Sequence, residues 1–162
     1  MAFSLEVTGV EELLRKMEQM GEKGEAAASV ALYEGARVTA DALSAAVQGI
    51  EAKRVKYPAP PGKKRMPSPE EKAVLEGAKH GVAKFRKGIT KVDTSVGYQN
   101  SGYGQINGKT VPVPLIANAI NSGTSFMKKQ PFIRKAISQS KGAAEAAIEN
   151  KLREELDKLS AD

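Results

Sequence analysis

The stretch from Leu115 to Ala136 constrains the fold most, because it combines a helical pattern, a helix stop and a helix start in close succession. Apolar residues recur at helical spacing in its first part, after Pro114 at a first-turn position. These residues are Leu115, Ile116, Ala119 and Ile120. Gly123 follows where a helix end favours a residue that tolerates positive φ. The pattern predicts a short apolar helix that ends at this glycine.

A second helix is predicted to start at Pro131. Proline fixes φ and has no N–H, so it suits a first turn, after which Phe132 and Ile133 can pack inward. An apolar stripe continues at helical spacing to residue 159. The stripe comprises Ile133, Ile137, Ala144, Ile148, Leu152, Leu156 and Leu159. Taken alone, this pattern describes a corner between two helices that needs no function beyond structure.

Two further helices are predicted in the first third of the chain. Residues 10–20 carry apolar side chains at helical spacing, with charged residues on the other face. Gly21 and Gly24 are expected to interrupt or bend this helix. Residues 25–49 are rich in alanine, which has the strongest helix propensity. We expect a long core helix there, in preference to a membrane-active one.

Strands are predicted at three places. Residues 3–7 alternate between apolar and polar side chains, and residues 89–98 alternate less strictly. Asn107-Gly108 is a strong hairpin signal, and the prolines at 112 and 114 place residues 111–113 at a sheet edge or strand end. The expected fold class is α+β. A small antiparallel sheet of three or four strands would have the long alanine-rich helix and the C-terminal helix packed on one side.

Positive charge is concentrated in the middle of the sequence. The whole chain of 162 residues has a formal net charge of +6. Residues 51–91 hold 12 basic and four acidic residues, a net charge of +8, and the rest of the chain carries −2. Five prolines between residues 53 and 69 favour an extended loop or arm. Ser68 and Glu71 form a capping-box pattern, and a helix is predicted from Pro69 to about Lys87, with a possible break near Gly77 or Gly81.

We therefore expect a single domain over residues 1–162, with residues 51–88 inserted in it as a basic proline-rich arm and a helix. The basic side chains of the arm can bind phosphate oxygens without reading sequence. These residues are Lys53, Arg54, Lys56, Lys63, Lys64 and Arg65. Tyr57 could stack on a base. For an isolated chain, a solvated loop explains the same residues equally well, and an arm that contacts a neighbouring subunit is a third reading.

No catalytic, metal-binding or cofactor-binding residues are predicted. The chain has no cysteine, so disulfides, thiolate metal sites and thiol catalysis are excluded. His80 is the one histidine, and in the predicted basic helix it reads as a surface residue. The glycine-rich residues 102–108 resemble a phosphate loop only loosely, because no helix start follows closely to hold an anion. No signal peptide or membrane span is evident, so we expect a soluble protein made in the cytoplasm. Because no catalytic motif is present, we expect no enzymatic activity.

The two parts of the corner carry a family resemblance. The run Asn121-Ser-Gly-Thr-Ser-Phe-Met127, followed by Gln130-Pro-Phe-Ile-Arg-Lys-Ala136, resembles the "Gly-Thr, then Pro-Phe-Leu/Ile-Arg-x-Ala" signature of the head–tail joining (neck or tail-completion) proteins of long-tailed bacteriophages. The opening at 9–17 and the segment 92–98 resemble that family's first strand and helix and its central strand. Within the signature, the corner residues are Gly123, Thr124, Pro131, Phe132, Ile133 and Arg134. The proline- and lysine-rich insertion departs from the family's usual pattern.

The resemblance implies a structural virion protein at the phage head–tail junction. Such a protein would form a ring, a hexamer matching the symmetry of the tail, between the head connector and the tail terminator or tail tube. DNA would pass through the ring, and the basic arm would face the DNA channel or an adjacent subunit. The alternative function is a basic nucleic-acid-binding module that acts as a monomer or dimer.

Overall fold

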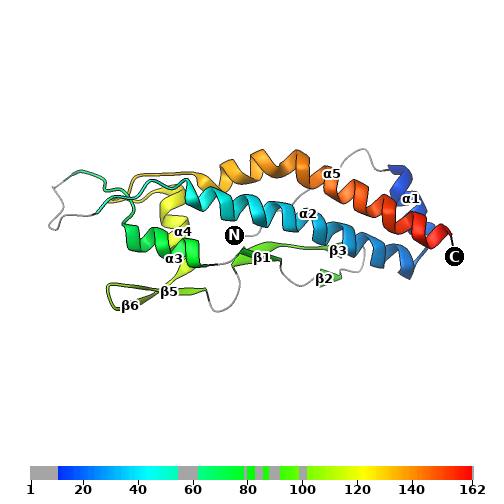
Figure 1. Cartoon of the computed structure of the whole chain (residues 1–162), viewed down its shortest axis with the longest axis horizontal. Coiled ribbons are helices and arrows are strands. Elements are labelled where there is room, and N and C mark those ends of the chain that lie inside the picture. Colours follow the sequence, from blue (N-terminus) through cyan, green and yellow to red (C-terminus); the bar gives the residue numbers. More distant parts are fainter. Residues whose placement is uncertain are drawn as a thin grey trace. The chain divides into compact units, whose positions relative to one another are not determined.

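The computed structural model describes residues 11–54, 62–78, 80–82, 86–87, 92–98 and 102–161, and it confirms the α+β class. Its helices are α1 (Glu11–Gln19), α2 (Glu22–Gln48), α3 (Pro69–Gly77), α4 (Val113–Ser122) and α5 (Phe132–Ser160). Its strands are β1 (His80–Val82), β2 (Arg86–Lys87), β3 (Val92–Asp93), β4 (Val96–Tyr98), β5 (Tyr103–Ile106) and β6 (Lys109–Pro112) (Figure 1).

The chain divides into two compact units. Unit 1 comprises Met1–Ala40, Gly81–Gly97 and Gln139–Asp162, and unit 2 comprises Asp41–His80 and Tyr98–Ser138. The two long helices, α2 and α5, contribute residues to both units. The prediction of a single domain stays a prediction.

Unit 1 is built on an apolar seam between α1, α2 and α5. Its buried members share one cluster: Leu13, Ala27, Ala31, Ile148, Leu152 and Leu156. Small side chains let α2 and α5 pack closely, and Gly35 is one such position. A Cβ at this position would meet Ile148 and lie 2.6 Å from its Cδ1 atom. The predicted alanine-rich core helix is therefore present, with bounds close to those expected.

The predicted break between the first two helices is also present. Gly21 has a φ of 56°, and it lies between the end of α1 and the start of α2. Gly24 lies inside α2 and does not interrupt it. Its role is close packing, because a Cβ there would overlap the backbone carbonyl of Met17.

Unit 2 contains the β5–β6 hairpin with α3 and α4. The register pairs Tyr103 with Pro112 and Ile106 with Lys109. The two turn residues, 107 and 108, have φ angles of 50° and 74°, as a type I′ turn requires. The helix α3 packs against β5 and α4, and α4 packs against β6. The predicted Asn-Gly hairpin and the strand end at Pro112 are confirmed.

The helix predicted from Pro69 to about Lys87 is wrong beyond Gly77. The capping box at Ser68 and Glu71 forms as expected, with Pro69 in the first turn. The helix then ends at Gly77, where a predicted break lies, because glycine has low helix propensity and Ala78 adopts an extended conformation. His80–Val82 and Arg86–Lys87 are strands, not helix.

The strand pairing also differs from the prediction, which was a single sheet of three or four strands. Among the described residues, strands pair two by two: β1 with β4, β2 with β3, and β5 with β6. The pairs β2–β3 and β5–β6 are antiparallel. The predicted strand over 89–98 is interrupted at Thr94–Ser95, and its two described pieces have different partners. The predicted strand at residues 3–7 lies outside the described residues.

Candidate functional site

The corner between α4 and α5 follows the prediction from its sequence. Gly123 caps α4 with a φ of 75°, and its N–H donates to the Ala119 carbonyl at 2.9 Å. The Thr124 hydroxyl oxygen then accepts from the N–H of Met127 at 2.9 Å and from the N–H of Phe126 at 3.3 Å. The Gly-Thr pair thus stops one helix and folds the chain into a tight polar turn.

The start of α5 depends on a residue that the sequence pattern does not single out. The Asn121 side-chain oxygen accepts from the N–H of Ile133 at 3.1 Å, so α4 supplies a cap for α5. Pro131 directly precedes the helix, and Phe132 and Ile133 are buried as predicted. Arg134 is exposed.

The basic arm is anchored on this corner through its C-terminal flank. The N–H of Arg65 donates to the Phe126 carbonyl at 2.8 Å, and the N–H of Lys128 donates to the Arg65 carbonyl at 2.9 Å. These bonds form a parallel bridge between Arg65 and Met127. The segments that carry the arm and the family-like signature are therefore joined through their backbones.

The N-terminal flank of the arm is held at the same place. The Gln130 side chain accepts from the Glu51 N–H at 2.9 Å and donates to the Glu51 carbonyl at 2.8 Å. The N–H of Lys53 donates to the Pro67 carbonyl at 2.9 Å. Both flanks are thus fixed in unit 2. Nothing in the spacing of Gln130 and Glu51, 79 residues apart, predicts this clamp.

Arg65 has a structural partner. Its guanidinium forms two 2.7 Å hydrogen bonds with the Glu71 carboxylate, and the two side chains are only 17% and 13% exposed. It also lies 5.6 Å from the Phe126 ring centroid, in a cation–π contact. Burial raises the pKa of Glu71, but hydrogen bonds from Arg65 and from the Ser68 N–H outweigh it and lower the pKa overall. Arg65 fixes the arm to the first turn of α3, which is the role the structure gives it.

The other described cations of the arm are exposed. The four exposed side chains are Lys53, Arg54, Lys63 and Lys64. Lys56 lies outside the described residues. The corner adds four exposed cations, of which only Arg134 is among the predicted corner residues: Lys128, Lys129, Arg134 and Lys135. Their common signal is the absence of any acidic residue between 98 and 138, where five basic residues occur.

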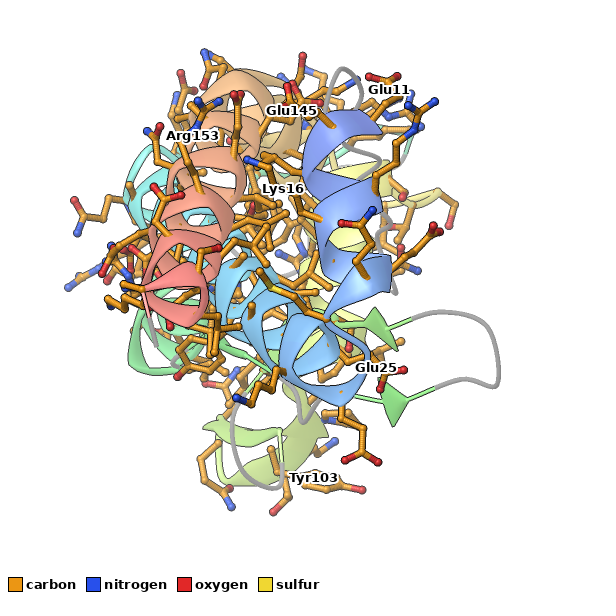
Figure 2. All side chains as sticks on the ribbon, turned by 90° about the vertical axis from the view of Figure 1, so that its right-hand side faces the viewer. Glu11, Lys16, Glu25, Tyr103, Glu145 and Arg153 are labelled. Carbon is orange, nitrogen blue, oxygen red and sulfur yellow. The ribbon has the colours of Figure 1, made fainter. Side chains whose placement is uncertain are left out.

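The two units therefore differ in net charge. Unit 2 has 13 basic and five acidic residues, a net charge of +8, whereas unit 1 has 12 basic and 14 acidic residues, a net charge of −2. The side chains in Figure 2 illustrate the mixed signs on the helices of unit 1, such as Glu11 and Lys16 on α1 and Glu145 and Arg153 on α5. The basic surface is a property of one unit.

The prediction that His80 is a surface residue on a helix is wrong. His80 is a half-buried residue in β1. Its Nδ1 atom lies 3.1 Å from the Ser44 hydroxyl, and its ring centroid is 4.6 Å from that of Tyr98. Burial lowers the pKa of His80 and raises the pKa of Tyr98 to about 12. Within the described residues, no cluster of histidine, aspartate and glutamate side chains is arranged to hold a metal ion.

No described helix is both long and apolar enough to cross a bilayer. Comparison of the chain with protein-family models, with curated proteins and with solved structures found no match.

Proposed function

We propose that the chain is a structural virion protein of the phage head–tail junction, acting in neck or tail completion. In this proposal it forms a ring, a hexamer, between the head connector and the tail terminator or tail tube, and DNA passes through the ring. Its work is binding and not catalysis. It would be made in the host cytoplasm, assembled into the virion, and would need no membrane and no cofactor.

The observation that carries the proposal is the charge difference between the units, together with the anchoring of the arm. Eight exposed cations of unit 2 come from segments that are tied to each other by backbone hydrogen bonds. Tied segments hold their charges in place without further loss of chain entropy on binding. In a ring, the +8 of each unit 2 is repeated around one axis, and a confined channel concentrates the resulting field.

The chemistry of these cations fits the backbone of DNA. Lysine side chains bind phosphate oxygens as mobile point charges, which favours contact without sequence readout. A duplex that must slide through a channel requires weak, uniform contacts of this kind. The described arm cations Lys53, Lys63 and Lys64 are the proposed contacts, with Arg54 beside them.

The second candidate is a nucleic-acid-binding module that acts as a monomer or dimer. The exposed Phe126 favours it, because an exposed aromatic ring among cations is a stacking platform for bases. The two functions differ in whether one isolated chain binds DNA strongly.

Particle imaging tests the proposal directly. In a phage that carries the gene, a strain lacking it is expected to produce separate full heads and finished tails, and complementation should restore whole particles. Whole, infectious particles from the deletion strain would overturn the proposal.

A salt titration separates the two candidates. For the module, binding of the purified chain to duplex DNA should weaken steeply with salt, and the variant Lys53→Gln/Lys63→Gln/Lys64→Gln should lower the slope of log K against log salt by roughly 3. The matched control is Lys16→Gln/Lys23→Gln/Lys141→Gln, which removes three exposed unit 1 lysines. For the ring protein, the isolated chain should bind weakly. Tight binding by a monomer would favour the module.

A further inference from the structure

Phe126 presents an aromatic ring to solvent from a backbone that is held on both sides. The residue is 56% exposed. Its N–H donates to the Thr124 hydroxyl oxygen at 3.3 Å, and its carbonyl accepts from the N–H of Arg65 at 2.8 Å. A group that is fixed before binding loses little conformational entropy when a partner arrives. The ring is therefore preorganised for contact.

The Arg65 guanidinium also holds this ring. It lies over the ring, 5.6 Å from the centroid, and is itself fixed by two 2.7 Å hydrogen bonds to the Glu71 carboxylate. This cation–π contact orients the ring but does not cover it, since more than half of Phe126 stays exposed. The remaining ring surface can stack on a flat partner.

Exposed lysines flank the ring at the bridge between Arg65 and Met127. The bridged residues themselves are largely buried, whereas their neighbours Lys64, Phe126 and Lys128 are exposed. The backbone hydrogen bonds of the bridge run from Arg65 to Phe126 and from Lys128 to Arg65. The aromatic ring and the two lysines are thus displayed together from two joined segments.

The acidic residues of these segments do not cancel the cations. Residues 51–54, 62–71 and 123–135, which the hydrogen bonds of the corner and of the arm's flanks tie together, hold nine basic and three acidic residues, a net charge of +6. Glu71 is already paired with Arg65. A partner that matches both the ring and its surroundings is flat and anionic.

We propose that Phe126, Lys64 and Lys128 form a binding site for single-stranded DNA, with one unpaired base stacked on the ring and neighbouring phosphates on the lysines. Every base has a π-face, so the site accepts any sequence. In a duplex the faces of the bases are covered by their neighbours, and the ring has nothing to stack on. The inference specifies which form of DNA unit 2 holds, and it rests on the proposed function in so far as unit 2 contacts DNA.

Fluorescence anisotropy of a labelled oligothymidine tests this preference with the full chain. Cations alone favour duplex, because duplex has the higher charge density. We expect a single strand of about 12 nucleotides to bind about tenfold more tightly than a duplex of the same length at the same salt. Phe126→Leu should remove this preference, whereas Phe126→Tyr should keep it, since only the tyrosine ring can stack.

The lysines should respond differently from the ring. Lys64→Gln/Lys128→Gln should lower the slope of log K against log salt for the single strand by about 1.4, whereas Phe126→Leu should leave that slope unchanged. All three positions are exposed, so the variants should keep the wild-type melting curve.

A fluorescent probe at the ring reports stacking directly. The chain has no tryptophan, so Phe126→Trp introduces a single indole, and a base stacked on it should quench much of its emission when the single strand is added. The matched control is Tyr103→Trp, at a position of unit 2 that is 60% exposed. Its emission should change little.

The contrary outcomes are distinct. Duplex bound as tightly as the single strand, full affinity in Phe126→Leu, or equal quenching in Phe126→Trp and Tyr103→Trp would each overturn the inference. A single-stranded RNA bound about tenfold more tightly than the DNA would also overturn it, because the 2′-hydroxyl would then be part of what is recognised.

These measurements use the purified chain, so they are independent of the particle phenotype. A preference for the single strand, together with normal particles from the deletion strain, would leave this site standing and remove the proposed function. No preference, together with separate heads and tails from the deletion strain, would remove only this site.

Discussion

The two units hold their chain segments together by different means. In unit 1, the buried contacts between helices are made by aliphatic side chains and glycine, as in the cluster around Ile148. In unit 2, irregular segments are joined by side chains that bond to backbone: Asn121 to Ile133, Thr124 to Met127, and Gln130 to Glu51. A helix satisfies its own backbone, so apolar contact is enough, whereas loop backbone needs partners from elsewhere. The unit that needs polar partners is also the one that carries the basic surface.

The comparison predicts that unit 1 is most sensitive to volume. Gly35→Leu should lower the free energy of unfolding by about 3 kcal/mol, because its side chain would displace Ile148 from the core. The matched control is Gly142→Leu on α5, where a Cβ meets nothing within 4 Å. This control should be neutral or stabilising by up to about 1 kcal/mol, since leucine is the better helix former. Urea unfolding of both variants measures the difference; equal losses would show that the close approach at Gly35 has no energetic weight.

Unit 2 should be most sensitive to loss of charge pairing. Arg65→Met leaves the Glu71 carboxylate without its bidentate partner at a site only 13% exposed, and we expect a loss of about 2 kcal/mol. Arg37→Met, which breaks an exposed pair with Glu34, is the control and should change little. Chemical denaturation reports both. If the two variants lose the same stability, the Arg65 pair is no stronger than a surface pair.

The same pair predicts a pH dependence confined to acid. The folded-state pKa of Glu71 is lowered, so its contribution to stability is present above the unfolded-state pKa and is lost as pH falls through the folded-state pKa. The stability difference between wild type and Glu71→Gln should therefore be constant near neutral pH and shrink in that acid window. Denaturant melts at a series of pH values measure it. A difference that is independent of pH down to the lowest value would mean that Glu71 is not ionised in the fold.

A smaller effect is expected at the cap of α5. Asn121→Ala removes the acceptor for the Ile133 N–H and should cost about 1 kcal/mol. Asn118→Ala, an exposed position on the same helix, removes no cap and serves as its control. Thermal unfolding followed by circular dichroism compares them. Identical curves would indicate that another group caps α5.

The smallest effect is expected on the outer face of α5. Glu154 pairs with Lys151 and Lys158 at 3.0 and 2.6 Å, but the side chains of Glu154 and Lys158 are 50% and 58% exposed. Glu154→Gln should leave the midpoint of urea unfolding unchanged within error, because exposed ion pairs contribute little. A clearly lower midpoint would show that these ion pairs stabilise the helix.

The sequence predicts the periodic parts of this fold well. Helices α2, α4 and α5 follow from alanine content, apolar spacing and the glycine at 123, and the hairpin follows from Asn107-Gly108. These signals are local, because each depends on residues that are close together in the sequence. The stretch after Gly77 is different, because Ala78, Val82 and Phe85 are spaced as in a helix, whereas His80–Val82 form a strand that pairs with β4.

The candidate site divides in the same way. Composition identifies the basic arm, but spacing cannot show that Arg65 is paired with Glu71 and that Lys63 and Lys64 are exposed. Nor can it find Lys128 and Lys129, which the parallel bridge at Met127 brings beside the arm's flank. Such contacts depend on which distant segments meet, and single-chain patterns carry no signal for that.

The Gln130 clamp on Glu51, together with the bond from Lys53 to Pro67, closes the base of the arm independently of the residues between the flanks. Lengthening a loop whose ends are already joined costs little loop-closure free energy, about 0.6 kcal/mol per doubling of its length. An affinity tag or a fluorophore-binding peptide spliced in between the two joined flanks should therefore leave unit 2 folded.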